Sequence, residues 1–518
     1  MELYKPKESV IEKYVYDKNK KLSEVIKDTG IIEISGDIDI HVKGIHSDSR
    51  KIKEGYIFFA INGFTQKGSA FIESAVKNGA KAIICEKEEN VEEISKKYNV
   101  VACSSENVRK TLALCAKNYY DDPSKDMYVI GITGTKGKST TTSLIRDILV
   151  KDKKKTLLVG SIGGYLNYEK ISNNTRTTPE SFEIFEMLSY AKENGAKYAV
   201  LEVSSQSMIT ERVTGISFDI TGFTNFSEDH ISEIEHPNIE AYFKAKTDAV
   251  LLAKKNILNA DDEMVISLKN MLEKRGNAVI TTGIENDANV FADNIALEKD
   301  KSTFDISITG KEIEEYAIGI QLSIPGMFNI YNCLMATAVA NEIGIDTDII
   351  AETFENVKVM GRLESVENDL GLTILLDYAH TANSLENVLK TIKPNVRGKL
   401  ICAWGVGGNR DKEKRPIMGR ISGKYADYTI LMSDQVRNED PLKILQDIEK
   451  GLKEVTNNYE IIVDRREGIK KAIQMATKED IIVIPGFGHD MYQEIAGVKY
   501  YFNEREVIRD IISNMKGK

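Results

Sequence analysis

MYVIGITGTKGKSTTTSLIRDILV, residues 127–150, settles the class of fold to which this chain belongs. An apolar strand runs into a glycine-rich turn and then into an amphipathic helix. Glycines let backbone N–H groups curve around phosphate oxygens, and the first turn of a helix adds a favourable dipole. The segment therefore predicts a nucleotide site, with candidate residues Gly134, Thr135, Lys136, Gly137, Lys138, Ser139 and Thr140.

Within this turn the residue types suit a bound triphosphate. Lys138 would neutralise the β- and γ-phosphate charge, and Ser139 or Thr140 would reach Mg²⁺. The strict pattern G-x-x-x-x-G-K-[ST] fails at one position, because Ile132 stands where the first glycine belongs. An ordinary glycine turn is the competing interpretation, but the lysine and hydroxyls between a strand and a helix favour the nucleotide.

Alternation of apolar strands with helical stretches continues on both sides of this segment and predicts an α/β protein with mostly parallel sheets. Strand, helix and strand over 56–86 form a separate unit, which ends at DDPSKDM. A second doubly wound sheet is expected near the C-terminus, with strands at 372–378, 399–405, 428–433 and 481–486. We expect three domains: 1–125, 126–357 with the phosphate loop, and 358–518. Residues 293–325 alternate polar and apolar residues, which suggests an antiparallel addition.

Composition excludes several classes of protein. At 518 residues the chain is too long for one core, and its net charge of −10 argues against a nucleic-acid scaffold. Its five cysteines form no CxxC pair, which is typical of reduced core cysteines in a reducing compartment. The N-terminus lacks the apolar segment of a signal peptide, and no apolar run approaches the roughly 20 residues of a membrane span. We expect a cytoplasmic monomer that neither inserts into membranes nor binds nucleic acid.

The variant T-G-T-x-G-K-[ST] resembles the phosphate loop of Mur ligases and folylpolyglutamate synthetases. Further segments are similar, in order, to the UDP-N-acetylmuramoyl-tripeptide synthetases of the Mur ligase family, the MurE type. They are HSDSR (46–50), TTPES (177–181), LEVSS (201–205), FTNFSEDH (223–230), AYFKAK (241–246), NADD (259–262), FNIYN (328–332), GRLE (361–364), DYAH (377–380) and GGNRDKEKRP (407–416). The HSDSR segment argues against the folate branch, which resembles this chain only from the phosphate loop onward.

The resemblance implies an ATP-dependent ligase of peptidoglycan synthesis with three domains. They are an N-terminal α/β domain (1–125) that binds the UDP substrate, a central P-loop ATPase domain with a mostly parallel sheet (126–357), and a C-terminal Rossmann-like, doubly wound domain that binds the amino acid (358–518). A carboxylate of UDP-N-acetylmuramoyl-L-Ala-D-Glu attacks ATP to form an acyl phosphate, which the amine of an amino acid then attacks. Catalysis of this kind rests on positioning and charge stabilisation. The implied catalytic residues are Lys138, Glu202, His230 and Lys246, and the implied Mg²⁺ ligands are Ser139, Glu202, His230 and Lys246 in its N-carboxylated (carbamylated) form.

Each of these assignments has a simpler alternative. Glu202 ends an apolar strand, where a carboxylate needs either a metal ion or an ordinary salt bridge. A lone histidine such as His230 is more often structural. From residues alone, Lys246 cannot be distinguished from a solvated lysine on a helix, although a lysine with a lowered pKa can react with CO₂.

The resemblance also implies the substrate contacts. Asn329, Arg362 and Asp377 match nucleotide-binding positions, and Arg362 lies at a domain junction where it could report closure on ATP. Candidate contacts of the UDP substrate are Ser49, Phe64, Thr65, Gln66, Thr177, Thr178, Ser204 and Arg212. On residues alone HSDSR is better interpreted as a polar turn, and Thr177 and Thr178 could equally cap a helix and still contact the substrate, whereas Arg212 suits a substrate carboxylate.

The incoming amino acid is expected at Arg410, Asp434, Gln435, Val436, Arg437, Gly486 and Asp490. Family members that add meso-diaminopimelate usually carry D-N-P-R and G-K-G-H-E, which stand here as DQVR (434–437) and GFGHD (486–490). Arg437 favours a second carboxylate and hence diaminopimelate, with lysine or another amino acid left open. A paralogue with another acceptor, or a nucleotide-binding protein with weak turnover, are the remaining alternatives.

Overall fold

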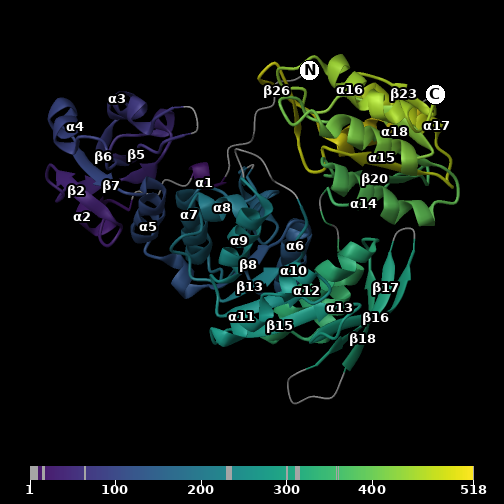
Figure 1. The fold of residues 1–518 in the computed structure, drawn as a ribbon, viewed down its shortest axis with the longest axis horizontal. Helices are drawn as coiled ribbons and strands as arrows, with labels where there is room; N and C mark the ends of the chain where they lie inside the picture. The colour runs from purple at the N-terminus through teal and green to yellow at the C-terminus, as the bar shows by residue number, and fades with distance from the viewer. Residues whose placement is uncertain are drawn as a thin grey trace.

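The computed structural model describes residues 10–13, 18–63, 66–174, 176–228, 236–298, 301–309, 316–357, 359 and 361–516. These residues form three lobes, each built on its own sheet (Figure 1). The N-terminal lobe lies at the left of Figure 1, the central lobe in teal below the middle, and the C-terminal lobe in green and yellow at the upper right. The predicted α/β class with mostly parallel sheets is confirmed.

The N-terminal lobe has a five-stranded sheet in which only the edge strand β2 runs antiparallel to its neighbour. Its order is β2 (Ile31–Ser35), β7 (Val101–Ser105), β6 (Ala80–Glu86), β5 (Tyr56–Phe59) and β4 (Gly44–His46). The short strands β1 (Lys20–Lys21) and β3 (His41–Val42) pair beside it. The helices of this lobe are α2 (Leu22–Val25), α3 (Ile72–Lys77), α4 (Val91–Tyr98) and α5 (Val108–Tyr119), whereas α1 (Val10–Lys13) contacts residues 169–172 and 181–193 of the central lobe. Asn90 and Asn107 cap α4 and α5 with their side chains, which satisfies N–H groups that a helix leaves free.

The central lobe has an eleven-stranded sheet. Its order is β11 (Glu169–Ser172), β10 (Gly163–Leu166), β9 (Thr156–Gly160), β12 (Tyr198–Glu202), β8 (Tyr128–Thr133), β13 (Ile220–Phe223), β14 (Lys255–Asn259), β15 (Ala278–Gly283), β16 (Val290–Leu297), β17 (Ser302–Ile308) and β18 (Tyr316–Leu322). Strands β9 to β16 in this order are parallel, and antiparallel strands extend the sheet at both ends. The antiparallel addition predicted within 293–325 is confirmed by β16 to β18.

Eight helices accompany this sheet in the described part of the chain. They are α6 (Lys138–Lys151), α7 (Ser181–Glu193), α8 (Ser205–Ile209), α9 (Ile239–Val250), α10 (Glu263–Ile266), α11 (Lys269–Lys274), α12 (Met327–Ile343) and α13 (Thr347–Glu355). One core joins apolar side chains of β8, α6 and α12, among them Ile130, Ile148 and Met335. Because α6 is packed on this core, its N-terminus and the glycine-rich turn are held rigidly at the carboxyl end of β8.

The C-terminal lobe has a six-stranded sheet with cores on both faces. Its order is β19 (Glu364–Ser365), β20 (Thr373–Asp377), β24 (Ile481–Pro485), β21 (Leu400–Trp404), β22 (Tyr428–Leu431) and β23 (Tyr459–Ile461). All pairings are parallel except that of β19. The helices are α14 (Ala382–Ile392), α15 (Lys414–Tyr425), α16 (Pro441–Lys453), α17 (Arg465–Met475) and α18 (Glu504–Lys516), and a hairpin joins β25 (Tyr492–Ile495) to β26 (Val498–Tyr501).

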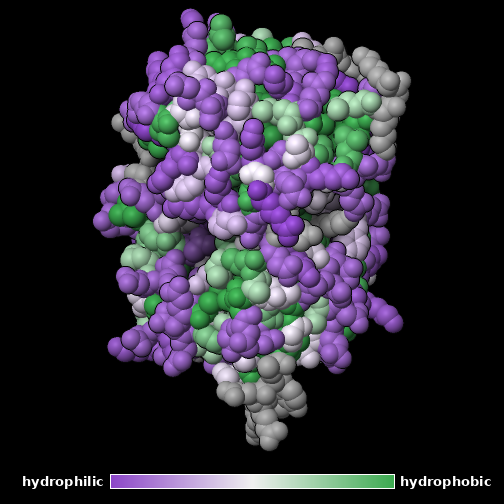
Figure 2. Space-filling view, turned by 90° about the vertical axis from the view of Figure 1, so that its right-hand side faces the viewer, coloured by the Kyte–Doolittle hydropathy of each residue, from purple (hydrophilic) through white to green (hydrophobic). Residues whose placement is uncertain are grey.

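The surface is that of a polar protein on the face drawn in Figure 2, where hydrophobic residues lie in separate small groups. Among the described residues, we find no helix with the length and apolar character needed to cross a membrane. All five cysteines are buried and carry free thiols. Burial raises the pKa of the Cys85, Cys103 and Cys402 thiols to about 12, so these residues behave as apolar core side chains.

Candidate functional site

The glycine-rich turn between β8 and α6 is held by the segment that follows β13. Thr135 N donates to the Asn225 carbonyl at 2.9 Å, and Thr224 Oγ1 donates to the Lys136 carbonyl at 2.6 Å. Gly137, which precedes α6, has φ of +87°, a conformation that a residue with a Cβ rarely adopts. The Lys138 ammonium donates to the Gly134 carbonyl at 2.8 Å. The turn therefore keeps the shape of a phosphate cradle, with its lysine beside it.

Glu202 is the buried carboxylate next to this turn, at the end of β12. Only 1% of its surface is exposed. Its Oε2 accepts a hydrogen bond from Ser139 Oγ at 3.0 Å, and its Oε1 accepts one from Ser161 N at 2.9 Å. Burial raises the pKa of Glu202, while the positive charges of Lys138 and Arg362 act against that rise. An ionised carboxylate here is favoured by cations, whether side chains or a metal ion.

Lys246 of α9 is buried against the same turn. Its side chain is 1% exposed, and its Nζ donates to the Gly134 carbonyl at 2.7 Å and lies 4.8 Å from the centre of the Tyr242 ring. The solvated lysine that the residues alone suggest is therefore wrong. His230 lies outside the described residues. The neighbouring His236 is described and contacts Ser205 Oγ through Nε2 at 2.9 Å.

These side chains suit Mg²⁺ beside a nucleotide. In the described part of the chain no three His, Cys, Asp or Glu side chains are grouped to hold a metal by themselves. Mg²⁺ at nucleotide sites needs only one or two protein oxygens, because phosphate and water supply the others. The Ser139 hydroxyl and the Glu202 carboxylate, 3.0 Å apart, are oxygen donors of that kind.

A cavity of about 310 Å³ lies between the glycine-rich turn and the C-terminal lobe. Two hydrogen bonds cross it: Arg362 Nη2 donates to Ser139 Oγ at 3.4 Å, and Lys136 Nζ donates to Thr381 Oγ1 at 3.4 Å. Its lining is Lys136, Gly137, Ser139, Thr140, Asn225, Asn259, Asp261, Asp262, Phe328, Tyr331, Asn332, Arg362, Asp377, Ser384, Asn387 and Val388. The cavity could hold part of a nucleotide between the central and C-terminal lobes.

Asp377 and Asn329 have different positions relative to this cavity. Asp377 lines it, and its carboxylate accepts hydrogen bonds from Leu363 N and Ala379 N, while burial raises its pKa. Asn329 is buried beneath the lining, where it donates to the Pro325 carbonyl at 2.9 Å and accepts from Asn332. Asn225, Asp261 and Tyr331 also line the cavity but were not predicted as site residues, although they lie in the segments FTNFSEDH, NADD and FNIYN that carry the resemblance.

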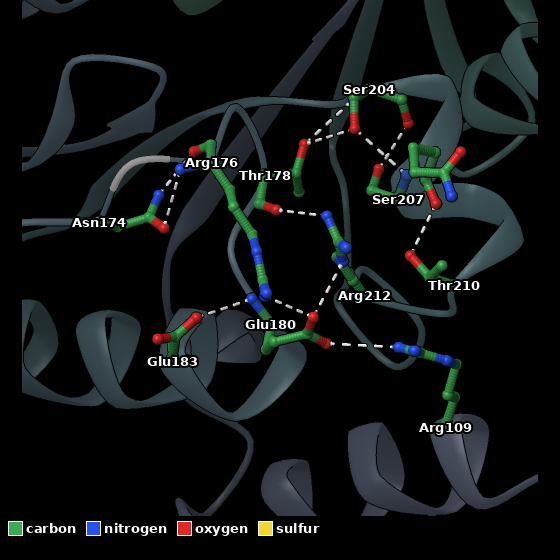
Figure 3. Close-up of polar contacts among 11 residues, drawn as sticks. Arg109, Asn174, Arg176, Thr178, Glu180, Glu183, Ser204, Ser207, Thr210 and Arg212 are labelled. Atoms are coloured by element: carbon green, nitrogen blue, oxygen red, sulfur yellow. Dashed lines mark hydrogen bonds and ion pairs between the residues drawn. The ribbon is translucent and has the colours of Figure 1, made fainter. Parts of the chain in front are cut away.

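Four candidate contacts of the UDP substrate lie around the end of β12, and Figure 3 shows three of them: Thr178, Ser204 and Arg212. Thr178 Oγ1 donates to the Glu202 carbonyl at 2.8 Å and accepts from Ser204 N at 3.0 Å. Arg212 Nη1 donates to the Thr178 carbonyl at 3.1 Å. Thr177 Oγ1 accepts from Ser161 Oγ at 3.1 Å. The structure therefore brings these residues together around the end of β12.

The candidate uridine contacts belong to the N-terminal lobe. Ser49 is buried in the 3₁₀ turn Ser49–Lys51, where its carbonyl accepts from Asn78 Nδ2 at 2.8 Å. Gln66 is exposed, and Phe64 and Thr65 lie outside the described residues. The His46 ring contacts the ring of Phe182 of α7 at a tilt of 55°, with ring centres 4.7 Å apart, so the end of β4 touches the central lobe. Burial lowers the pKa of His46 to about 4.

Most candidate amino-acid contacts meet at the carboxyl ends of β22 and β24. Gln435 Nε2 donates to Asp490 Oδ2 at 3.4 Å and to the Tyr492 carbonyl at 2.7 Å, and Gly486 N donates to the Asp377 carbonyl at 2.9 Å. Asp434 and Val436 are buried beside them. Burial, with Asp434 nearby, raises the pKa of Asp490 to about 7.

The two arginines proposed for the amino acid differ in environment. Arg437 Nη1 donates to the Gly408 carbonyl at 2.6 Å, and its Nε lies 3.8 Å from Glu494 Oε2. Arg410 is exposed on the loop that follows β21. A carboxylate of the hairpin therefore already lies beside Arg437, and the DQVR motif alone does not predict it.

Comparisons with known proteins identify the same family in all three parts of the chain. Three family descriptions match: "Mur ligase family, catalytic domain" over residues 41–120, "Mur ligase middle domain" over 132–340, and "Mur ligase, glutamate ligase domain" over 361–488. The UDP-N-acetylmuramoyl-L-alanyl-D-glutamate--2,6-diaminopimelate ligase of Caldanaerobacter subterraneus subsp. tengcongensis is 38% identical over 482 residues, covering 93% of this chain and 97% of that protein. The protein of the same name in Aquifex aeolicus is 41% identical over 473 residues, covering 91% and 94%.

A solved structure gives the same result. The structure of a UDP-N-acetylmuramoyl-L-alanyl-D-glutamate--2,6-diaminopimelate ligase superposes with a TM-score of 0.65 at 28% identity, and the match covers 96% of this chain and 99% of that one. The similarity therefore extends over all three lobes rather than over the phosphate loop alone.

Proposed function

This chain belongs to the Mur ligase family, and we propose that it is an ATP-dependent ligase that joins meso-diaminopimelate to UDP-N-acetylmuramoyl-L-alanyl-D-glutamate. The observation that carries the proposal is the convergence on Glu202. Ser139 of the phosphate turn, Ser161 beside Thr177, and Thr178 all bond to this one residue. A nucleotide in the phosphate turn and an acceptor at Thr177 and Thr178 would therefore both lie beside Glu202.

The reaction follows from that arrangement. A carboxylate oxygen of the acceptor attacks the γ-phosphorus of ATP, ADP leaves, and an acyl phosphate remains. The amine nitrogen of diaminopimelate attacks the acyl carbon, gives up a proton, and the carbon–oxygen bond breaks to release phosphate. Lys138 and Arg362 would balance the negative charge that develops on the transferred phosphoryl group. Arg362, which already spans the cavity to Ser139, would draw the C-terminal lobe over the acyl phosphate and exclude water.

We assign the metal and the modified lysine to this site as part of the proposal. Ser139 and Glu202 would hold Mg²⁺, which supplies Lewis-acid charge stabilisation when bound. His230 and an N-carboxylated Lys246 are the further candidates for its coordination. The burial of Lys246 supports the modification, because desolvation favours the neutral amine that reacts with CO₂. Intact-mass measurement at neutral pH, with and without bicarbonate, tests for an added CO₂.

The three lobes would divide the binding work. Residues 1–125 would hold the UDP moiety, with Ser49, Phe64, Thr65 and Gln66 as candidate contacts; residues 126–357 would hold ATP; and residues 358–518 would hold the amino acid. Arg437 supports diaminopimelate, because a guanidinium pairs well with a second carboxylate. Arg410 and Asp490 are the other amino-acid contacts proposed. ATP as co-substrate supports a cytoplasmic location.

The test is phosphate release from ATP and Mg²⁺ with UDP-N-acetylmuramoyl-L-alanyl-D-glutamate, and with diaminopimelate, lysine, ornithine or no amine in parallel. We expect release that requires both the acceptor and diaminopimelate, and that Lys138→Met abolishes. Release with lysine or ornithine alone would overturn the choice of amino acid. Release with none of the amines would overturn the ligase assignment.

A further inference from the structure

Glu180, the residue before α7, lies at the centre of three guanidinium groups (Figure 3). Its Oε1 is 2.5 Å from Arg176 Nη1 and 3.4 Å from Arg212 Nε, and its Oε2 is 3.7 Å from Arg109 Nη1. The three arginines come from different parts of the chain. Arg109 belongs to α5 of the N-terminal lobe, Arg176 to the loop before α7, and Arg212 to the turn after α8.

The charges in this cluster do not balance. Two carboxylates face three guanidinium groups: Glu180 pairs with all three arginines, and Glu183, whose pKa burial raises, accepts from Glu180 N at 2.9 Å and acts on Arg212 from farther away. Arg212 Nε is buried and makes no hydrogen bond among the described residues, although Glu180 Oε1 lies 3.4 Å away as an ion-pair partner. Burial and the charges of Arg176 and Arg109 lower the pKa of Arg212, although Glu180 opposes them. A buried donor that makes no hydrogen bond and an excess of positive charge favour the entry of a further anion.

The acceptor proposed above carries an anion of the right kind. Its D-glutamate has two carboxylates, and the ligation consumes one of them. The other, the spectator carboxylate, needs a receptor close to the reacting one. Arg212 is such a receptor by position, because it bonds to the Thr178 carbonyl while Thr178 Oγ1 bonds to the Glu202 carbonyl. In the structure, however, the Glu180 carboxylate already lies beside Arg212.

We propose that Glu180 occupies the receptor for the spectator carboxylate in the free protein, and that Arg109, together with Arg176, draws Glu180 away from Arg212 when the acceptor binds. The inference rests on the proposed function. Arg109 is then a positioning residue rather than a catalytic one: it holds the competing carboxylate and never touches the acceptor. Because Arg109 belongs to the N-terminal lobe, the position of that lobe sets how strongly Glu180 competes, which couples lobe placement to acceptor affinity.

Two single variants and their double variant test this arrangement through the KM for the acceptor. Arg109→Gln removes one of the guanidinium groups that attract Glu180 away from Arg212. Glu180 should then compete more strongly for Arg212, and the KM for the acceptor should rise about tenfold, the size of one lost charge-assisted contact. Glu180→Gln removes the competitor, so the KM for the acceptor should fall. In the double variant the loss caused by Arg109→Gln should disappear. We expect kcat and the KM for ATP to stay within about twofold throughout.

A matched control is Arg420→Gln, which removes an arginine from an exposed pair with Glu454 on the C-terminal lobe. It should leave the KM for the acceptor unchanged. A purely structural bridge between lobes predicts a different pattern, in which Arg109→Gln and Glu180→Gln raise KM alike and the double variant shows no recovery. That pattern would overturn the inference.

An acceptor analogue whose spectator carboxylate is a carboxamide separates the two proposals. The wild-type protein should bind it more weakly than the acid, and Arg109→Gln and Glu180→Gln should not alter its KM, because there is no charge for Glu180 to compete with. Equal effects of Glu180→Gln on acid and amide would overturn the role of Glu180 while leaving the ligase assignment intact. Absence of acceptor-dependent phosphate release in the wild-type protein would instead overturn the proposed function and this inference with it.

Discussion

The C-terminal lobe contains a buried ion pair whose loss should be measurable. Arg465 and Glu504 are 1% and 0% exposed, and Arg465 Nη2 lies 2.7 Å from Glu504 Oε1. Arg465 also donates to the Ser433 carbonyl at 3.0 Å and lies 4.0 Å from Asp434 Oδ2. The substitution Arg465→Met therefore leaves two carboxylates buried without their shared counterion.

The expected cost follows from that burial. Removing one partner of a buried pair costs about 3–5 kcal/mol, because the other charge stays desolvated. With a urea m value of about 2 kcal/mol/M for a domain of this size, the midpoint should fall by about 2 M. Replacing both partners by apolar residues, as in Arg465→Met with Glu504→Leu, should recover most of this loss.

The loss should depend on pH in a definite direction. Burial raises the pKa of both Glu504 and Asp434, and removing Arg465 raises them further. A carboxyl group whose folded pKa is raised stabilises the fold when protonated, and that contribution is lost as the pH rises above its unfolded pKa. The deficit of Arg465→Met should therefore be larger at about pH 8 than at about pH 5.

The chain offers a selective probe for this measurement. Trp404 is its single tryptophan and is fully buried in β21 of the same lobe, where Nε1 donates to Ser422 Oγ at 3.0 Å. Tryptophan fluorescence during urea unfolding therefore reports the C-terminal lobe. A midpoint within about 0.3 M of wild type at about pH 8, or a deficit that grows towards acid pH, would refute the reasoning.

Three further predictions concern the candidate site. Burial raises the pKa of Asp490 to about 7, and this carboxyl should attract the distal ammonium of diaminopimelate only when it is ionised. The KM for diaminopimelate should therefore fall as the pH rises through about 7. The same pH dependence in Asp490→Asn would contradict this prediction. Arg437→Met should reduce the preference for diaminopimelate over lysine, measured as a ratio of kcat/KM, by about 10–100-fold, the value of a charge-assisted hydrogen bond; an unchanged ratio would count against Arg437. Lys246→Arg keeps a positive charge that cannot be carboxylated, so kcat should drop about 100-fold or more in the phosphate-release assay; wild-type turnover would exclude a carboxylated lysine.

Site residues that are close together in the chain could be predicted from the sequence. The phosphate turn lies within one strand–turn–helix unit, so its glycines, Lys138 and Ser139 could be predicted as nucleotide contacts from their spacing alone. The burial of Lys246, in contrast, could not be predicted from the sequence. On its helix it is one lysine among several polar residues, and only the packing of α9 against the turn buries it.

The sequence did not predict the contacts that join one lobe or hairpin to another. Arg109 and Glu180 are 71 positions apart by their numbers, and nothing in the residues around either one indicates that they pair. Glu494 is likewise an ordinary residue of a hairpin until β25 is bonded to the DQVR segment through Gln435 and Arg437. Such pairs depend on how whole lobes and hairpins pack.

By itself, the sequence determined the α/β class, the phosphate turn and the family to which the chain belongs, because strand and helix periodicity and short motifs are set by residues close together in the chain. Only the tertiary structure decided which charges meet: Glu202 with Ser139 and Ser161, Glu180 with three arginines, and Arg437 with Glu494. The physical reason is that electrostatic energy depends on distance and burial, and both are properties of the packed chain rather than of its order.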